Sequence, residues 1–227
     1  MHKHFAGAAA LSLLVALAPA FAGGATYGKN LIRNPGAEAG AGSEDGNDLL
    51  PIPKWETSGN FTAVVYGAPD FPAPTDPGPK KRGLNFFAGG PDAATSSARQ
   101  AIDVSAYAAN IDARAVRYAA SGWLGGFGSQ DDGAALKFVF ADAAGAELRS
   151  LVMDGPTAAE RGNVTALMKR SSHGVVPRGT RTVLVELTMT RVAGNYNDGY
   201  ADALSFVLAP ASGDDQDEDT AIASTTN

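Results

Sequence analysis

The stretch Val183-Leu184-Val185-Glu186-Leu187-Thr188-Met189-Thr190 decides the fold class of this chain. Large apolar side chains occupy every second position, and most of the positions between them are polar. A period of two is the pattern of a β-strand with one buried face, because successive side chains of a strand point to opposite faces. The β-branched residues in the stretch favour the same structure. The pattern therefore predicts a strand that buries Val183, Val185, Leu187 and Met189.

The same alternation recurs on both sides of this stretch. It is found in four further segments, at 100–104, 116–124, 136–140 and 204–208, and segment 62–66 is expected to be a short strand as well. Segment 105–112 is instead the best candidate for a short helical turn. Strands at this spacing, without regularly alternating helices, predict an antiparallel β-sandwich. We therefore expect an all-β chain of about 8 to 10 strands, close to the strand number of a jelly roll.

The N-terminal part of the domain has a different composition. Residues 30–79 are rich in Gly, Pro, Asn and Asp, and five prolines lie between Pro69 and Pro79. These residue types favour turns and loops. A long irregular region is therefore expected before most of the strands.

The composition excludes several classes of protein. Of the 227 residues, 44% are hydrophobic, which is enough for a sizeable core. The net charge of −6 argues against nucleic-acid binding, because such proteins normally carry a basic face. The absence of cysteine excludes disulfides, thiolate metal sites and cysteine nucleophiles.

The two ends of the chain are expected to lie outside the folded domain. Residues 1–22 have a basic start, an apolar run and an Ala20-Phe21-Ala22 cleavage motif, as in a secretory signal peptide. The apolar run is shorter than the roughly 20 residues that span a membrane. Residues 210–227 form an acidic tail with the composition of a disordered segment. We expect a secreted protein, extracellular or periplasmic, whose domain is 23–209, and a Cys-free exported chain suggests a bacterial source.

No catalytic constellation is recognisable in the sequence. There is no Gly-x-Ser-x-Gly motif, and His173 is the only histidine after the signal peptide. Asp131 and Asp132 could form half of a glycosidase carboxylate pair, but a solvated turn before a strand is the favoured interpretation. We therefore name no catalytic residue and expect that the protein is not an enzyme.

Two short motifs at opposite ends of the domain carry more information. The first is Asn30-Leu31-Ile32-Arg33-Asn34-Pro35-Gly36-Ala37-Glu38, followed by Trp55. The second is Asn197-Asp198-Gly199-Tyr200-Ala201-Asp202-Ala203-Leu204-Ser205-Phe206. Together they resemble the opening and closing signatures of galactose-binding-like jelly rolls, among them carbohydrate-binding modules of the four/nine and twenty-two types. The F-box-associated sugar-binding domain is a more distant resemblance.

This resemblance implies a structural calcium site. In the family, an Asp of the closing strand and a Glu of the opening turn share a Ca²⁺ ion. Here these residues would be Asp202 and Glu38, with carbonyl oxygens from the turn Asn34 to Gly36. Counting back by two from Leu204 places Asp202 and Tyr200 on the core-facing row, where a carboxylate needs a partner. The alternative is that Asp202 caps a loop by accepting backbone N–H bonds.

A ligand site is expected where an aromatic side chain stands beside amides and carboxylates. The loop with Asn195, Tyr196 and Asn197 has this composition, and so does the loop with Gln130 and Asp131 beyond Trp123. Core packing is the alternative for Trp123, and an ordinary turn is the alternative for Tyr196.

The sequence thus predicts a secreted, non-catalytic protein that resembles a carbohydrate-binding module. It would bind a glycan or polysaccharide and hold a structural Ca²⁺ ion. One alternative is a glycoside- or ester-cleaving hydrolase on the same scaffold. Another is a structural or adhesive surface protein. The glycan prediction follows from the family resemblance, since a fold by itself does not imply a ligand.

Overall fold

The structure is a computed structural model that describes residues 26–211. The predicted signal peptide 1–22 lies outside the described residues, as does the tail beyond Ala211. Within residues 26–211, no helix has the length and apolar character needed to cross a membrane.

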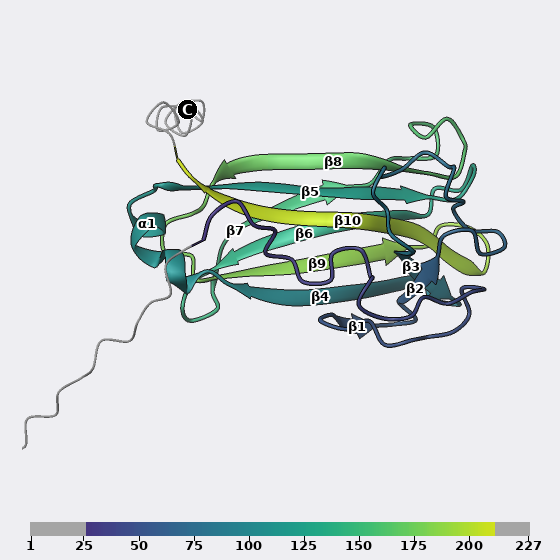
Figure 1. Ribbon diagram of the computed structural model, residues 1–227, viewed down its shortest axis with the longest axis horizontal. Helices are drawn as coiled ribbons and strands as arrows, with labels where there is room; N and C mark the ends of the chain where they lie inside the picture. Colours follow the sequence, from purple (N-terminus) through teal and green to yellow (C-terminus); the bar gives the residue numbers. More distant parts are fainter. Residues whose placement is uncertain (1–25, 212–227) are drawn as a thin grey trace, which may run out of the picture.

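Within residues 26–211, ten strands form two five-stranded antiparallel sheets that face each other (Figure 1). The first, here called the β9 sheet, has the order β1 (Glu56–Ser58), β4 (Thr95–Asp103), β9 (Thr182–Thr190), β6 (Gly133–Ala141) and β7 (Glu147–Asp154). The second, the β10 sheet, has the order β2 (Thr62–Val65), β3 (Asn85–Pro91), β10 (Tyr196–Pro210), β5 (Val116–Gly126) and β8 (Ala166–Val175). This architecture confirms the predicted β-sandwich.

The predicted helical turn is also present. A short 3₁₀ helix, Ser105–Tyr107, leads directly into α1 (Ala108–Asp112) at one end of the sandwich. The strand β10 runs to Pro210, one residue past the predicted domain boundary. The sequence did not single out β1, β3, β7 and β8. Much of β3 is buried on both faces, β1 and most of β7 are exposed, and most of β8 is half-buried or exposed, so a clear alternation of apolar and polar residues is lacking.

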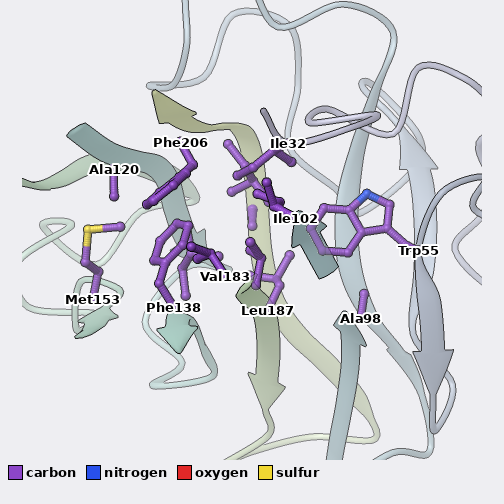
Figure 2. Close-up of a cluster of buried hydrophobic side chains, with 14 of the residues drawn as sticks. Ile32, Trp55, Ala98, Ile102, Ala120, Phe138, Met153, Val183, Leu187 and Phe206 are labelled. Atoms are coloured by element: carbon purple, nitrogen blue, oxygen red, sulfur yellow. The ribbon is translucent and has the colours of Figure 1, made fainter. Parts of the chain in front are cut away.

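The core lies between the sheets and follows the predicted alternation. Val183, Val185, Leu187 and Met189 of β9 are all completely buried. Across from them, Phe206 of β10 stacks on Phe138 of β6, with ring centroids 5.1 Å apart (Figure 2). Strands of both sheets contribute to this one cluster, so burial of apolar area ties the two sheets together.

A second apolar cluster lies on the other side of the β10 sheet. It is built on Val64, Phe86, Ala88, Leu167 and Tyr200, and further aromatic side chains pack against it. The outer face of the β10 sheet is therefore covered by loops at the end away from α1 (Figure 1). This end carries the residues that the sequence singled out for ligand binding.

Candidate functional site

The opening and closing motifs meet in space, as the resemblance predicted. Asn30 lies beside β10, where its side-chain amide donates to the Leu204 carbonyl at 2.9 Å. The Asn30 side-chain oxygen accepts the N–H of Phe206 at 3.0 Å. The asparagine thus supplies hydrogen bonds along the edge of β10 and joins the N-terminal part of the described chain to the last described strand.

The rest of the opening motif holds its own turn together. The Asn34 side chain bonds to the N–H of Ala39 and to the carbonyl of Pro53, both at 2.9 Å. The Asn34 backbone carbonyl accepts the indole N–H of Trp55, also at 2.9 Å. Trp55 is buried in the core, so this hydrogen bond fastens the turn to the core. These contacts give Asn34 and Trp55 structural roles.

The closing strand carries a β-bulge that the sequence analysis did not foresee. Asp202 pairs with Trp123 and Ser205 pairs with Ser121, so three steps along β10 match two along β5. Ala203, inside the bulge, has a left-handed φ of 49°. An extra residue reverses which face the following side chains occupy.

Because of this bulge, the predicted orientation of Asp202 and Tyr200 is wrong. Both were expected on the same row as Leu204, facing the core between the sheets. Leu204 does face that core, but Tyr200 belongs to the cluster on the outer face of the β10 sheet. Asp202 bonds to Tyr66, which packs against the same outer cluster. The period of two was counted through an irregular position, and the parity was therefore wrong.

Asp202 is buried and accepts two hydrogen bonds. The Tyr66 hydroxyl donates to one carboxylate oxygen at 2.8 Å, and the N–H of Ala203 donates to the other at 2.5 Å. Burial raises the pKa of Asp202 to about 7, an effect that these two hydrogen bonds oppose. The negative charge of Glu38 raises the pKa further. The two carboxylates are thus close enough to interact.

Glu38 and Gly36 complete the predicted calcium set. Glu38 accepts backbone N–H bonds from Leu84 and Asn85 at 2.9 to 3.1 Å. A side chain added at Gly36 would stand 2.8 Å from an Asp202 carboxylate oxygen, so the opening turn touches that carboxyl directly. Within residues 26–211, no cluster of three or more Asp, Glu or His side chains could hold a metal. An ion here would therefore need backbone carbonyls beside Glu38 and Asp202, which suits calcium chemistry.

The second candidate site is a pocket of about 210 Å³ at the loop end of the β10 sheet. Three aromatic residues line it, namely Phe71, Phe127 and Tyr196. Three carboxylates share the same lining, and these belong to Asp45, Asp70 and Asp198. Pro69 completes the wall. This combination can contact the apolar face of a ligand and orient its hydroxyl groups.

Tyr196 is fixed in place by neighbours from distant segments. Its ring meets Phe71 edge to face, with centroids 5.1 Å apart. Its hydroxyl donates to the Gly46 carbonyl at 3.0 Å. A side chain at Gly46 would collide with the Phe71 ring, and Gly46 also has a left-handed φ of 77°. Only glycine suits both requirements, so this position lets the two rings approach.

Asp198 is the pocket carboxylate with the strongest perturbation. Burial raises its pKa to about 6, although the hydrogen bond from the Tyr200 hydroxyl at 2.5 Å acts in the opposite direction. Asp132 lies near enough to raise the pKa of Asp198 as well. A carboxyl with a pKa near 6 in a pocket is a candidate for ligand binding or proton transfer.

Two buried charged side chains hold the loops around the pocket. Asp132, fully buried, accepts the N–H groups of Val192, Ala193 and Asp198 at 2.6 to 2.9 Å. The guanidinium of Arg161 donates to five backbone carbonyls, those of Phe127, Gly128, Gln130, Pro156 and Val164. The structure thus places Asp132 in a buried network, whereas the sequence had favoured a solvated turn for it.

The other predicted ligand residues are dispersed. Asn195 is exposed, and its backbone carbonyl accepts bonds from Asp92 and Arg191. Asn197 is completely buried beside Gly89, so its side chain does not face solvent at the rim. Trp123 is half-buried on the outer face, opposite Asp202 and outside the pocket lining.

The second predicted loop is divided in the same way. Gln130 is half-buried, and its amide would lie 3.9 Å from a side chain at Gly194, next to the Tyr196 loop. Asp131 accepts the N–H of Ala158 and lines a different hollow, between β6 and the segment 154–157. Of the six predicted ligand residues, only Tyr196 therefore lines the pocket.

Sequence reasoning missed most of the pocket. Phe71, Asp70 and Asp45 lie in the irregular N-terminal region, far in sequence from β10. Phe127 follows directly on β5, in the glycine-rich segment Gly125 to Gly128. The usable signal was Asp45-Gly46, a turn dipeptide, together with the aromatic between two prolines at 69 and 72. Neither signal indicates by itself that these residues meet Tyr196.

Comparison with known proteins supports the fold. No protein-family model matches the sequence, and no curated protein matches it. Among solved structures, the chain is similar to the Stig cyclase Fisc from Fischerella sp. TAU in complex with an indole compound. The identity is 12%, the match covers 82% of this chain and 100% of that chain, and the TM-score is 0.52.

Two carbohydrate-binding structures are also similar to this chain. The family 16 carbohydrate binding module-2 is 14% identical over 78% of this chain and 99% of that chain, with a TM-score of 0.48. The Clostridium thermocellum xylanase 10B CBM22-1–GH10 modules, complexed with xylohexaose, are 11% identical over 70% of this chain, with a TM-score of 0.39. The match spans 26% of the xylanase chain.

At these identities the similarity shows the fold alone. The chain has the jelly-roll fold that the two sequence motifs predicted. The same fold also serves a cyclase, so the fold does not decide between binding and catalysis. That decision depends on the residues of the site.

Proposed function

We propose that this chain is a secreted, non-catalytic glycan-binding protein. The pocket of Phe71, Phe127 and Tyr196 is its ligand site, with Asp198 and Asp45 as the groups that bind hydroxyls. The observation that carries the proposal is the composition of the pocket, in which three aromatic residues and three aspartates line one cavity on a jelly-roll scaffold. Secretion rests on the signal-peptide pattern of residues 1–22.

The chemistry of sugars supports this assignment. A pyranose has an apolar face of C–H groups that packs against an aromatic ring, and its rim of hydroxyls needs acceptors and donors. Carboxylates accept strong hydrogen bonds from hydroxyl groups. A carboxyl with a pKa near 6 can also donate a hydrogen bond when it is protonated. A volume of about 210 Å³ suits one or two sugar units at the end of a chain better than a long polysaccharide segment.

The proposal includes a structural calcium ion. Glu38 and Asp202 would hold it, with the carbonyl of Gly36, because these groups converge where the opening turn meets β10. A divalent cation would offset the repulsion between the two carboxylates and fasten the irregular N-terminal region. The Asn34 carbonyl, also predicted as a ligand, already accepts the indole N–H of Trp55, so this proposal gives the backbone ligand position to Gly36.

The ligand site is tested by binding measurements on matched variants. A glycan array identifies a sugar, and calorimetry then gives its dissociation constant for each variant. Tyr196→Ala should weaken binding by about 1–3 kcal/mol, as expected for an aromatic anchor. Tyr196→Phe is the control, because it keeps the ring and loses only the bond to Gly46. Equal affinity of Tyr196→Ala and the wild type for a confirmed sugar would place the ligand elsewhere.

A second function, glycoside hydrolysis, is favoured by one specific observation. Asp198 combines a pKa of about 6 with two other carboxylates, Asp45 and Asp70, in the same pocket. Glycosidases use two carboxyl groups, one of them with a raised pKa. A turnover assay on the bound sugar separates the two functions. Hydrolysis by the wild type that is lost in Asp198→Asn, with binding retained, would establish the enzyme.

A further inference from the structure

With its carboxylates ionised, the ligand pocket offers acceptors of hydrogen bonds but no free donor. Its lining side chains are three aromatic rings, a proline and the carboxylates of Asp45, Asp70 and Asp198. The hydroxyl of Tyr196 already donates to the Gly46 carbonyl at 3.0 Å. No lysine, arginine, amide, serine or threonine is among the described residues that line the pocket. A neutral sugar has hydroxyls that both donate and accept, so these side chains match only half of its hydrogen-bonding capacity.

Asp198 has a carboxylate oxygen without a protein partner. The residue is only 8% exposed, yet it lines the pocket. One of its oxygens accepts the Tyr200 hydroxyl at 2.5 Å, and within residues 26–211 the other accepts no hydrogen bond. The buried guanidinium of Arg161 lies outside the pocket lining and donates to backbone carbonyls instead. A positively charged ligand would offset both the burial of the Asp198 charge and its repulsion by Asp132.

The carboxylates are distributed around the pocket and do not converge on one point. Asp45 and Asp70 come from two segments of the irregular N-terminal region, whereas Asp198 lies on β10. Burial raises the pKa of Tyr196, and the charges of Asp198 and Asp45 raise it further, so both carboxylates act on the same aromatic residue. Within residues 26–211, no group of three or more Asp, Glu or His side chains could hold a metal ion. The negative charge of the pocket therefore suits a cation that is larger than a metal ion.

The aromatic residues of the pocket favour the same kind of ligand. The face of an aromatic ring attracts a cation that lies within about 6 Å of the ring centroid. Phe71 and Tyr196 meet edge to face with centroids 5.1 Å apart, and Phe127 adds a third ring. Aromatic cages recognise organic ammonium groups in this way. A primary ammonium group also has three donors and no acceptor, which complements the free acceptors of the pocket.

We propose that the ligand of this pocket is a glycan with free amino groups, such as glucosamine units, whose ammonium group lies among the aspartates and aromatic rings. This proposal rests on the glycan-binding function proposed above and adds the charge of the ligand to it. The ammonium group donates a charge-assisted hydrogen bond to the unpartnered oxygen of Asp198, while the C–H face of the sugar packs on a ring. Acetylation removes the charge and two of the three donors, so the pocket discriminates against N-acetylated sugars.

Calorimetry with matched disaccharides tests this proposal on the full chain. The probes are the disaccharide of glucosamine, its N-acetylated form, and cellobiose, which has a hydroxyl in place of each amine. The measurement is made at a pH where the amine is protonated and the carboxylates are ionised. The glucosamine disaccharide should bind at least about tenfold more tightly than either neutral probe, because hydrogen bonds between charged groups are the strong ones. High salt should reduce this preference.

Two variants remove negative charge from the pocket. Asp70 is exposed, its side chain makes no hydrogen bond within residues 26–211, and asparagine tolerates its left-handed φ of 67°. In Asp70→Asn the preference for the glucosamine disaccharide should fall about two- to fivefold, as for an exposed ion pair. Asp198→Asn keeps an oxygen that accepts the Tyr200 hydroxyl, and here the preference should fall about tenfold. The control Asp131→Asn removes the same charge from an exposed residue outside the pocket lining, so the preference should stay unchanged.

The possible failures separate this proposal from the glycan-binding function. Equal affinity of the wild type for the glucosamine disaccharide and cellobiose would overturn the amino-sugar proposal and leave glycan binding intact. A preference that falls as much in Asp131→Asn as in Asp198→Asn would also overturn it, because the preference would then reflect net charge. Binding of tetramethylammonium without binding of any disaccharide would overturn both the amino-sugar proposal and glycan binding.

Discussion

The buried carboxylate of Asp132 offers the sharpest test of how the ligand pocket is held. Its three backbone donors, Val192, Ala193 and Asp198, lie on either side of Tyr196, in the loop before β10 and at the start of β10. In Asp132→Ala these N–H groups lose their acceptor. A buried donor without a partner costs about 1–3 kcal/mol, whereas a donor that water can reach costs much less.

Burial decides how the three bonds contribute. Val192 and Ala193 are exposed, so water can replace the carboxylate there at small cost. Asp198 is buried, and its N–H would be left without an acceptor. Together with the small cavity, we expect Asp132→Ala to lower the free energy of unfolding by about 3 kcal/mol. For a domain of this size, that corresponds to about 6–12 °C in melting temperature.

Thermal unfolding followed by circular dichroism measures this loss. Asp132→Asn keeps an acceptor for Val192 and Ala193 but turns its NH2 group toward the buried N–H of Asp198, so it should lose most of the same free energy. The neighbouring variant Asp131→Ala is the control, since Asp131 is exposed and accepts a single N–H, that of Ala158. Asp132→Ala melting at the wild-type temperature would refute the argument that this carboxylate holds the loop.

Three further predictions concern charge, metal and processing. The pKa of Asp198 is raised in the folded state, so this group stabilises the fold at low pH and that contribution is lost as the pH rises through about 6. Asp198→Asn should remove up to about 3 kcal/mol of this decline in unfolding free energy, measured by urea titration between about pH 4 and pH 8. If calcium joins Glu38 to Asp202, a chelator should lower the melting temperature of the wild type by about 5–10 °C and leave Asp202→Ala unchanged. No effect of chelator, with Asp202→Asn melting like the wild type, would identify Asp202 as a cap. N-terminal sequencing of the exported protein should begin at Gly23, and a product that begins at Met1 would contradict the signal peptide.

The sequence alone determined the fold class and the contact between the two motifs. Alternation in Val183 to Thr190 predicted which side chains of β9 are buried, because the side-chain period of a strand is a local property of the backbone. The opening and closing motifs identified Asn30 and the Asp202 region as neighbours. That the two motifs lie side by side followed from the family resemblance, and the structure confirms this contact.

The orientation of Asp202 could not be read from the sequence. One extra residue at Ala203 moves Asp202 and Tyr200 to the outer face of the β10 sheet. No residue type announces this bulge, since Ala rarely adopts a positive φ. The bulge forms because β10 pairs with β5 on both sides of it while the opening turn packs against it, and those are tertiary contacts.

The pocket is likewise a product of the tertiary structure. Tyr196 and Asp198 lie two residues apart at the start of β10, but Phe71, Asp45 and Phe127 come from segments up to about 150 residues away in sequence. Loops carry weak local preferences, so their side chains meet only where the sheets bring the loop ends together. Buried groups such as Asp132 and Arg161 then fix the loops through backbone hydrogen bonds. A one-dimensional pattern can mark which residues are chemically able to bind, whereas the packing of the sandwich decides which of them share a site.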